Sequence, residues 1–310
     1  MSDTPFRQFD PTSPVAIIGL GVIGAKVAWS CARSGMRTIG YDIDPAAAQQ
    51  ALALAASWGS DADREAVQRN FSVTASLTEA LAGVQLAFEN VPEVPELKGR
   101  VLAEVGERGE SEMYIGTNTS SLLSIPLARA SGRPKRFFAM NFTDPTDGRL
   151  VELMAPAAAA ETITFARRWA RAQGMVPIAV QRDEMGYSFN RLWRVIKKEV
   201  LRQISAGIST PENIDRAWML TFGTDAGPCG LMDQVGLATI AAIEQRYADA
   251  SGDPADAPPD FLLKLVRAGR TGERAGRGLY EYPNPQFRSP SFLDGGEDSD
   301  QRPARQSRSE

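Results

Sequence analysis

The sequence predicts an α/β fold in which a doubly wound parallel sheet is followed by an all-helical C-terminal domain. From Val15 to about Val180, short β-branched or apolar runs alternate with helical stretches, which is typical of such a sheet. After Asp183 the strand signals stop and only helical patterns continue. We therefore expect three regions: residues 1–183 as an α/β domain, 184–288 as a helical domain, and 289–310 as a polar, disordered tail.

The first region contains six predicted strands and the helices between them. Alanine-rich helices are expected over Ala25–Ser34 and Pro45–Trp58. The predicted strands are Val15–Gly19, Arg37–Tyr41, Gln85–Glu89, Met113–Gly116, Arg136–Met140 and Val176–Val180.

The second region contains four predicted helices. Thr210 is placed as an N-cap, and Pro211 follows at the first helical position. The predicted helices are Phe189–Ala206, Pro211–Thr221, Leu231–Ala250 and Pro259–Ala268.

Composition narrows the class of protein. Apolar residues make up 43% of the 310 residues, enough for a substantial core. The net charge of −4 and the dispersed lysines and arginines argue against nucleic acid as a partner. With only Cys31 and Cys229, no secretory leader and no apolar run of about 18 residues, we expect a cytoplasmic protein without disulfides or membrane spans.

A glycine-rich loop follows the first predicted strand. Gly19, Gly21 and Gly24 form G-x-G-x-x-G, with Val22 and Ile23 between the last two glycines. The first two glycines allow a tight turn and close backbone approach to a pyrophosphate at the N-terminus of the next helix. The loop therefore predicts a dinucleotide site in a Rossmann-type domain, the alternative being a glycine turn without a ligand.

Asp42 is predicted to select the dinucleotide. It ends the second strand, 18 residues after Gly24. Its carboxylate is placed to accept hydrogen bonds from a ribose diol, and its charge would repel a 2′-phosphate. Arg37 lies at the start of that strand rather than directly after Asp42. The sequence therefore predicts NAD rather than NADP, and it predicts no metal.

No histidine occurs anywhere in the chain. Histidine is the usual proton carrier in enzymes that transfer hydride, because its pKa lies near neutrality. The predicted NAD site thus raises the question of which group carries the proton.

Four later segments, in this order and spacing, resemble the short-chain L-3-hydroxyacyl-CoA dehydrogenase family. A fifth stretch, FGTDAGPCGLMDQVGL, is similar to the glycine-proline turn with which that family enters a late helix. The resemblance runs from about Val15 to Tyr282 and implies an NAD-binding domain followed by a helical dimerising domain. The four segments are FENVPEVPELK (Phe88–Lys98), TNTSSL (Thr117–Leu122), RFFAMNFTDPTDGRLVELM (Arg136–Met154) and GYSFNRLW (Gly186–Trp193).

The resemblance also implies catalytic residues. In that family a histidine in G-M-H-F-F-N-P is the general base, and a glutamate about a dozen positions later orients it. A serine in the N-T-S-S segment and an asparagine opening the first helix of the second domain bind the substrate oxygen. By position these residues correspond to Ser120, Glu152 and Asn190, whereas Asn141 occupies the histidine position. The interval from Asn141 to Glu152 is one residue shorter than is usual in the family. An asparagine amide does not titrate, so it can orient a substrate oxygen but cannot take its proton.

Several assignments stay open at this point. Asp144, Glu152 or Tyr187 could replace the missing base if its pKa were raised, although Asp144-Pro145 is also an ordinary turn pair. Glu89 resembles a cofactor-edge residue of the family, and Lys98 could face a phosphate or solvent. Asn118 is a candidate cofactor ligand, whereas Ser121 is more typical of a helix cap. Arg194 with Lys197 or Lys198 shares one helical face with Asn190, and these residues form either an anion site or a solvated stripe.

Three functional hypotheses follow. The leading one is an NAD-dependent oxidoreductase acting on a 3-hydroxy/3-oxo acid or thioester with altered acid–base residues. The second is an imine (C=N) reductase, because a protonated imine needs less help from an acid. The third is an NAD-binding protein that has lost catalysis. The family resemblance also implies a homodimer.

Overall fold

The structure is a computed structural model that describes residues 5–146 and 148–295. It contains two compact units, which divide between Arg191 and Leu192. The sequence places this boundary earlier, at residue 184. The segment that follows Asp183 stays with the first unit because Asp183 accepts hydrogen bonds from the Ser124 and Ile125 amides and Tyr187 packs against Ala139.

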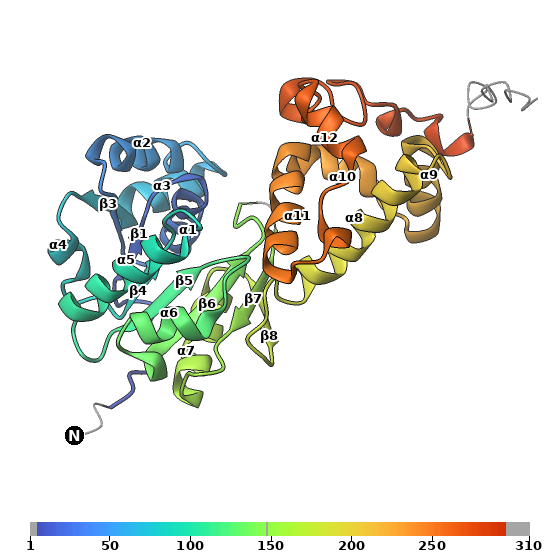
Figure 1. Cartoon of the computed structure of the whole chain (residues 1–310). Coiled ribbons are helices and arrows are strands. Elements are labelled where there is room, and N and C mark those ends of the chain that lie inside the picture. The colour runs from blue at the N-terminus through green and yellow to red at the C-terminus, as the bar shows by residue number, and fades with distance from the viewer. Residues whose placement is uncertain (1–4, 147, 296–310) are drawn as a thin grey trace, which may run out of the picture. The chain divides into compact units, whose positions relative to one another are not determined.

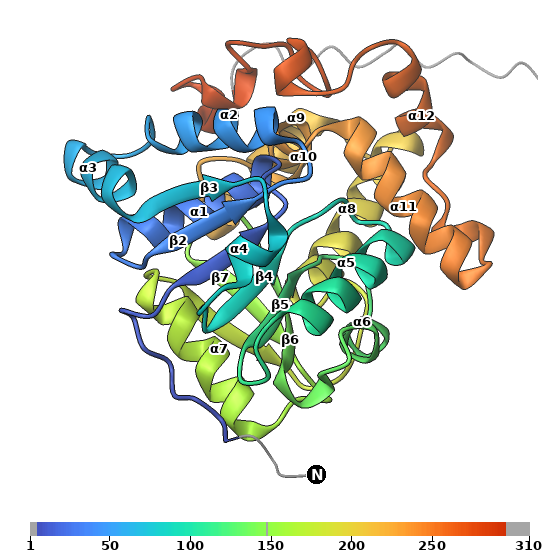
Figure 2. The same ribbon diagram turned by 90° about the vertical axis from the view of Figure 1, so that its left-hand side faces the viewer.

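The first unit is built on one eight-stranded sheet (Figures 1 and 2). Neighbouring strands are parallel except for β6 and β7, which pair antiparallel. The strand order β3-β2-β1-β4-β5-β6-β7-β8 is that of a doubly wound sheet extended at one edge. The strands are β1 (Val15–Ile18), β2 (Thr38–Tyr41), β3 (Phe71–Thr74), β4 (Leu86–Glu89), β5 (Tyr114–Asn118), β6 (Phe137–Phe142), β7 (Leu150–Met154) and β8 (Val176–Val180).

All six predicted strands are present, and their ends differ from the prediction by at most two residues. Two strands, β3 and β7, are absent from the prediction. β7 reads LVELM, and leucine, glutamate and methionine are good helix formers, so its sequence does not favour a strand. The predicted parallel, doubly wound sheet is present except at β6–β7, which pair antiparallel because the chain reverses between them without a crossover helix.

Helices cover both faces of the sheet. Along β1, Val15 and Ile17 join one apolar core with α1, α2, α3 and α7, whereas Ala16 and Ile18 join a second core with α4, α5 and α6. This alternation is the period of two that a strand between two helical layers requires. The helices are α1 (Val22–Arg33), α2 (Pro45–Ala55), α3 (Asp61–Asn70), α4 (Leu77–Leu81), α5 (Pro95–Arg108), α6 (Ser124–Ala130) and α7 (Ala160–Ala172), with a 3₁₀ turn at Pro134–Arg136.

The second unit is helical, as predicted. The Thr210 side chain caps α9 by accepting a hydrogen bond from the Asn213 amide. The single helix expected over Leu231–Ala250 is two helices, because Gly236 adopts a φ of 97° and breaks it. The elements are α8 (Phe189–Ser205), which begins in the first unit, α9 (Pro211–Phe222), α10 (Pro228–Val235), α11 (Leu237–Ser251) and α12 (Asp260–Arg267), with 3₁₀ turns at Pro254–Asp256, Glu273–Ala275, Gln286–Arg288 and Phe292–Asp294.

The predicted disordered tail starts at residue 289, but the structure is ordered beyond that residue. Phe292 is buried in the core of the second unit, and its carbonyl accepts a hydrogen bond from Arg216. The sequence SPSFLDGG is polar enough to predict disorder, but its phenylalanine anchors it. The remainder of the predicted tail, residues 296–310, lies outside the described residues.

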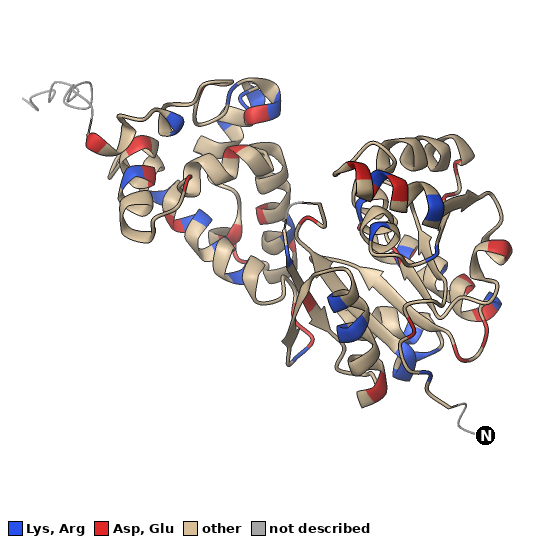
Figure 3. Ribbon diagram, turned by 180° about the vertical axis from the view of Figure 1, so that it is seen from behind, with Lys and Arg blue, Asp and Glu red and all other residues tan. Residues whose placement is uncertain are grey.

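Cys31 and Cys229 are both buried and unpaired with each other. None of the described helices combines the length and apolar composition needed to cross a bilayer. In Figure 3 basic and acidic residues are interspersed along the ribbon of each unit. The exclusion of nucleic acid from the partners stays a prediction from composition.

Candidate cofactor and catalytic site

The glycine loop has the geometry that its sequence predicts. Gly19 has a φ of 85°, which favours glycine, and a Cβ at Gly24 would lie 1.9 Å from the Gly19 carbonyl oxygen. At Gly21, by contrast, a Cβ would meet no atom within 4 Å. No side chain caps the N-terminus of α1 and no acid occupies its first turn. The open space in front of these free amides fits a pyrophosphate.

Asp42 lies directly after β2, beside the glycine loop. Its carboxylate accepts hydrogen bonds from the Leu20 amide at 2.8 Å and the Asp44 amide at 3.0 Å. A carboxylate has about four acceptor positions, so two remain for a ribose diol. Ile43, the next residue, is 90% exposed and offers an apolar surface rather than a cation. This arrangement fits NAD and offers nothing to a 2′-phosphate.

Substitution of Asp42 tests this assignment. We expect Asp42→Asn to weaken NADH binding about 10- to 150-fold, because a hydrogen bond to a charged group contributes about 1.5–3 kcal/mol. The variant should lose less affinity for NADPH, since the repelling charge is gone. Asp44→Ala is the matched control: Asp44 caps α2 through the Ala46 amide, so its loss should lower stability and leave NADH affinity unchanged. Equal weakening in both variants, measured by NADH fluorescence titration, would contradict the assignment.

A cavity of about 760 Å³ joins the glycine loop to the ends of β5 and β6. Of the residues predicted to bind cofactor or substrate, eight line it: Gly19, Gly21, Val22, Ile23, Asp42, Asn118, Ser120 and Asn141. Asn90 also lines it, and Asn90 Oδ1 is buried without a hydrogen-bond partner among the described residues. A buried acceptor without a donor indicates a place for a ligand N–H or O–H group.

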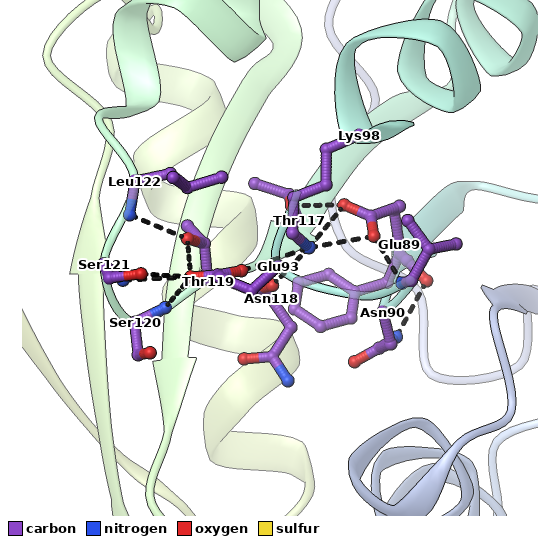
Figure 4. Close-up of polar contacts among 12 residues, drawn as sticks. Glu89, Asn90, Glu93, Lys98, Thr117, Asn118, Thr119, Ser120, Ser121 and Leu122 are labelled. Carbon is purple, nitrogen blue, oxygen red and sulfur yellow. Dashed lines mark hydrogen bonds and ion pairs between the residues drawn. The ribbon is translucent and has the colours of Figure 1, made fainter. Parts of the chain in front are cut away.

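Glu89 and Lys98 are not among the described residues that line the cavity. Their side chains point toward each other (Figure 4). Lys98 is 0% exposed, and its Nζ lies 2.9 and 3.0 Å from the two Glu89 carboxylate oxygens and 2.8 Å from the Asn118 carbonyl oxygen. Burial raises the pKa of Glu89, and the Lys98 charge with the Thr117 hydroxyl opposes that rise. With its three donors directed inward, Lys98 is not free to bind a phosphate. In this structure the two residues brace the segment that carries Asn118, and their contact with the cofactor stays a prediction.

Glu93 holds the loop that carries Ser120, a role that no motif in the sequence predicts. Glu93 Oε1 accepts hydrogen bonds from the Thr119 hydroxyl at 2.6 Å, the Ser120 amide at 2.9 Å and the Ser121 amide and hydroxyl, each at 3.0 Å (Figure 4). The Ser120 hydroxyl makes no hydrogen bond to any described residue. Glu93 thus fixes the backbone and leaves this hydroxyl for a ligand. The only signal in the sequence was a second acid in FENVPEVPELK.

Asn141 and Glu152 face each other across β6 and β7. The two residues are direct partners in the antiparallel register, and Asn141 Nδ2 donates to Glu152 Oε2 at 3.3 Å. The other oxygen, Glu152 Oε1, accepts from the Ser188 and Phe189 amides at 2.9 Å each, and so caps the start of α8. Asn190 follows directly in the first turn of α8; it is half-buried and is not part of the described cavity lining. Glu152 therefore links Asn141 to the segment that carries Asn190.

Comparison with known proteins identifies the family to which these features belong. A family model described as the NAD binding domain of 3-hydroxyacyl-CoA dehydrogenase matches residues 14–184. A second model, for the C-terminal domain of 3-hydroxyacyl-CoA dehydrogenase, matches residues 186–282. The chain belongs to the 3-hydroxyacyl-CoA dehydrogenase family. The protein is therefore an NAD-dependent oxidoreductase, and the predictions of family, fold and cofactor are confirmed.

Individual relatives agree with this assignment. A probable 3-hydroxybutyryl-CoA dehydrogenase of Deinococcus radiodurans is 29% identical over 276 residues, which cover 86% of this chain and 99% of the relative. The solved (S)-3-hydroxybutyryl-CoA dehydrogenase of Ralstonia eutropha has a TM-score of 0.80 at 27% identity, over 88% of this chain and 100% of its own. A solved diketoreductase has a TM-score of 0.78 at 27% identity, over 87% and 99% of the two chains.

Three residues are candidate replacements for the family histidine. The first, Glu152, accepts hydrogen bonds from three N–H groups and is not among the described residues that line the cavity. The other two are Asp144 and Tyr187. The Asp144 carboxylate is paired with Lys26 and bonded by Thr146; although burial opposes them, these contacts lower the pKa of Asp144. Tyr187 is 1% exposed, and its hydroxyl has no partner among the described residues. Burial, and then the charges of Glu93, Glu152 and Asp183, raise the pKa of Tyr187 well above its usual value. Neither group is poised to exchange a proton near neutral pH.

The basic side chains of α8, Arg194, Lys197 and Lys198, lie close to acidic residues of the second unit. Arg194 donates to Glu244 at 3.0 Å and to Asp256 at 2.8 Å, and Lys198 donates to Asp256 at 2.7 Å. Lys197 is buried 3.8 Å from Glu244, and burial lowers the pKa of Lys197. These side chains therefore form neither an anion site nor a solvated face. They link α8 to α11 and to the turn after it.

Proposed function

We propose that the protein transfers hydride between NAD(H) and C3 of an acyl thioester or acid, the position that carries the 3-hydroxy/3-oxo group in the substrates of the family. A single cavity carries this proposal. It is lined at one end by Gly21 and Asp42, which suit the cofactor, and at the other by Ser120 and Asn141, which correspond to family residues that contact the substrate oxygen.

Different residues of the cavity would bind the cofactor and the substrate. The glycine loop and Asp42 would hold NAD, which supplies the hydride acceptor and, when reduced, the hydride donor. The Ser120 hydroxyl would bind the heteroatom on C3, and Glu93 holds the backbone amide of the same residue. Asn141 would contact the same heteroatom, and Glu152 fixes the Asn141 side chain. Asn190, in the first turn of α8, is proposed to complete the set as in the family.

Hydride transfer to C3 is tested with NADH that carries deuterium at the transferred position. The purified full-length protein is incubated with a chain-length panel of 3-oxoacyl-CoA thioesters and the free acids, each with and without ammonium ions. Deuterium at C3 of any reduced product, detected by mass spectrometry, supports the proposal. NADH binding without deuterium transfer across the whole panel would instead favour the hypothesis of an inactive NAD-binding protein.

The role of Ser120 gives a further prediction. Ser120→Ala is expected to lower kcat/KM about tenfold, the value of one hydrogen bond of roughly 1.4 kcal/mol, with no change in melting temperature because the hydroxyl has no described protein partner. Ser121→Ala removes a neighbouring hydroxyl that faces Glu93, so it should affect stability more than kcat/KM. A larger loss of kcat/KM in Ser121→Ala than in Ser120→Ala would contradict this assignment.

We also infer a homodimer in the cytoplasm. Large apolar side chains are exposed on helices that lie in the second unit, as a dimerising domain would need: Leu192, Val195, Leu220, Phe222 and Val235. The buried, unpaired cysteines support a reducing compartment. Sedimentation equilibrium of the full chain tests the oligomeric state, and a monomer at micromolar concentration would contradict it.

A further inference from the structure

The reacting end of the cavity presents a hydrogen-bond acceptor and no evident proton carrier. We infer that the substrate turned over carries nitrogen rather than oxygen on C3, so that the reaction interconverts an amine and an iminium ion instead of an alcohol and a ketone. This inference rests on the proposed function, hydride transfer at C3, and names the substrate class for that site.

The orientation of the Asn141 amide follows from its neighbour. Glu152 accepts three N–H groups, two from the start of α8 and one from Asn141. A carboxylate has lone pairs and no hydrogen to donate, so only the Nδ2 end of Asn141 can face it. Asn141 is 5% exposed and lines the cavity. Its Oδ1, which makes no hydrogen bond to a described residue, is therefore the atom available to a ligand.

A fixed acceptor discriminates between substrate groups. The N–H of an amine or iminium ion donates to Asn141 Oδ1, whereas a ketone oxygen meets another oxygen there and finds no hydrogen bond. An alcohol O–H also donates to Oδ1, but an amide oxygen cannot take the proton that oxidation to a ketone releases. Alcohols should therefore bind without efficient turnover.

Hydride transfer at a C–N bond needs no protein acid or base. In the oxidation of a neutral amine, the C–H bond breaks and its electron pair leaves with the hydrogen to NAD⁺. The nitrogen lone pair then forms the C=N bond, and the nitrogen keeps its hydrogens as a cation. In the reverse direction a ketone and an ammonium ion lose water in solution to give the iminium ion, which accepts hydride at carbon and becomes a neutral amine. Hydride transfer of this kind can therefore proceed although the chain has no histidine and Asp144 is paired with Lys26.

The charge of the cavity also suits a cation. Among the described residues that line it, the charged side chains are all acidic, namely Asp42, Glu93 and Glu104. Glu152 adds a further carboxylate directly behind Asn141. Lys98 pairs with Glu89 at 2.9 Å and also lies 3.6 Å from Glu93 Oε2, so it offsets part of the Glu93 charge, whereas Asp42, Glu104 and Glu152 have no ion pair with Lys98. An iminium ion at Asn141 and Ser120 would be stabilised by this field, whereas a ketone gains nothing from it.

The product identifies the atom on C3. The full-length protein is incubated with NADH and acetoacetyl-CoA, with and without ¹⁵N-ammonium chloride, and the products are analysed by mass spectrometry. We expect NADH oxidation to depend on ammonium and the product to be ¹⁵N-labelled 3-aminobutyryl-CoA. Unlabelled 3-hydroxybutyryl-CoA formed at the same rate in both samples would overturn the inference and leave the proposed function standing. No reaction in either sample or with other chain lengths, while NADH binds, would overturn both.

A binding measurement tests the acceptor independently of turnover. Calorimetric titration gives the affinity of 3-aminobutyryl-CoA in the presence of NADH and of acetoacetyl-CoA in the presence of NAD⁺, two pairs that cannot react. In Glu152→Gln the new amide nitrogen faces Asn141, so the Asn141 amide should turn and direct Nδ2 to the cavity. We expect the ratio of the two affinities to shift about tenfold towards the ketone, the value of one hydrogen bond gained or lost.

A second variant covers the case in which Glu152→Gln does not fold, which its melting temperature would show. Asn141→Leu keeps the size of the side chain and removes Oδ1. It should weaken 3-aminobutyryl-CoA about tenfold and leave acetoacetyl-CoA unchanged. An unchanged affinity ratio in the folded variants would overturn the inference, because the acceptor would then play no part in substrate choice.

Discussion

Asn141→His is expected to raise kcat/KM for the reduction of a 3-oxoacyl-CoA by about 10²–10⁴-fold, the usual contribution of a positioned general acid or base. The histidine Nδ1–H would take the place of Asn141 Nδ2 opposite Glu152 Oε2, now 3.3 Å away. Its Nε2 would then face the cavity where Oδ1 is now. The cofactor end of the cavity is untouched by the change, so NADH affinity should stay the same. Steady-state kinetics of NADH oxidation measure the gain.

The double variant Asn141→His with Glu152→Gln is the control for this gain. The imidazole would still enter the cavity, but without a carboxylate to fix its tautomer and support its positive charge. Most of the gain should then be lost. A gain of equal size in the single and double variants would mean that the Asn141–Glu152 pair is not the element that orients a proton carrier in this site.

Lys98→Met is expected to lower the free energy of unfolding by about 3–5 kcal/mol, the usual cost of leaving one member of a buried ion pair alone. Glu89 is 1% exposed, and Lys98 is the cation that contacts both of its carboxylate oxygens. The Asn118 carbonyl would lose its partner as well. Urea unfolding followed by circular dichroism gives the change. NADH affinity should fall too, because Asn118 lines the cofactor cavity.

The double variant Glu89→Gln with Lys98→Met separates the two possible roles of Lys98. It removes the buried charge of both partners, so most of the lost stability should return. If Lys98 instead bound a cofactor phosphate, the single variant would lose NADH affinity with little change in stability. The double variant would then recover no NADH affinity.

The sequence predicts most fully those features that depend on contacts between residues a few positions apart. Gly19 and Gly24 are required by a turn whose other partner is a few residues away, so the motif alone predicts the loop. The alternation of strands and helices gave the doubly wound sheet for the same reason. β7 escaped prediction because LVELM favours a helix by composition, and pairing with β6 makes it a strand.

The roles of charged residues depended on contacts that no local pattern shows. Lys98 resembled a phosphate ligand in sequence, but nothing in PELK reveals that its side chain turns inward to Glu89. Glu93 belongs to no motif used in the prediction, because the amides it binds lie 27 and 28 residues further along. Glu152 was predicted as the partner of residue 141, whereas its second role as the cap of α8 needed the structure.

We expect that no side chain of this site serves as the proton carrier near neutral pH. This expectation is tested most directly by the pH dependence of 3-hydroxybutyryl-CoA oxidation by the wild-type protein and by Asn141→His. Without a protein base the alcohol proton passes to hydroxide, so the wild-type rate should be very low and rise about one log unit per pH unit without a plateau from about pH 6 to 9. The variant should reach a plateau above a pKa near the usual histidine value of about 6.5. A plateau of the wild-type rate in the same range would contradict this expectation.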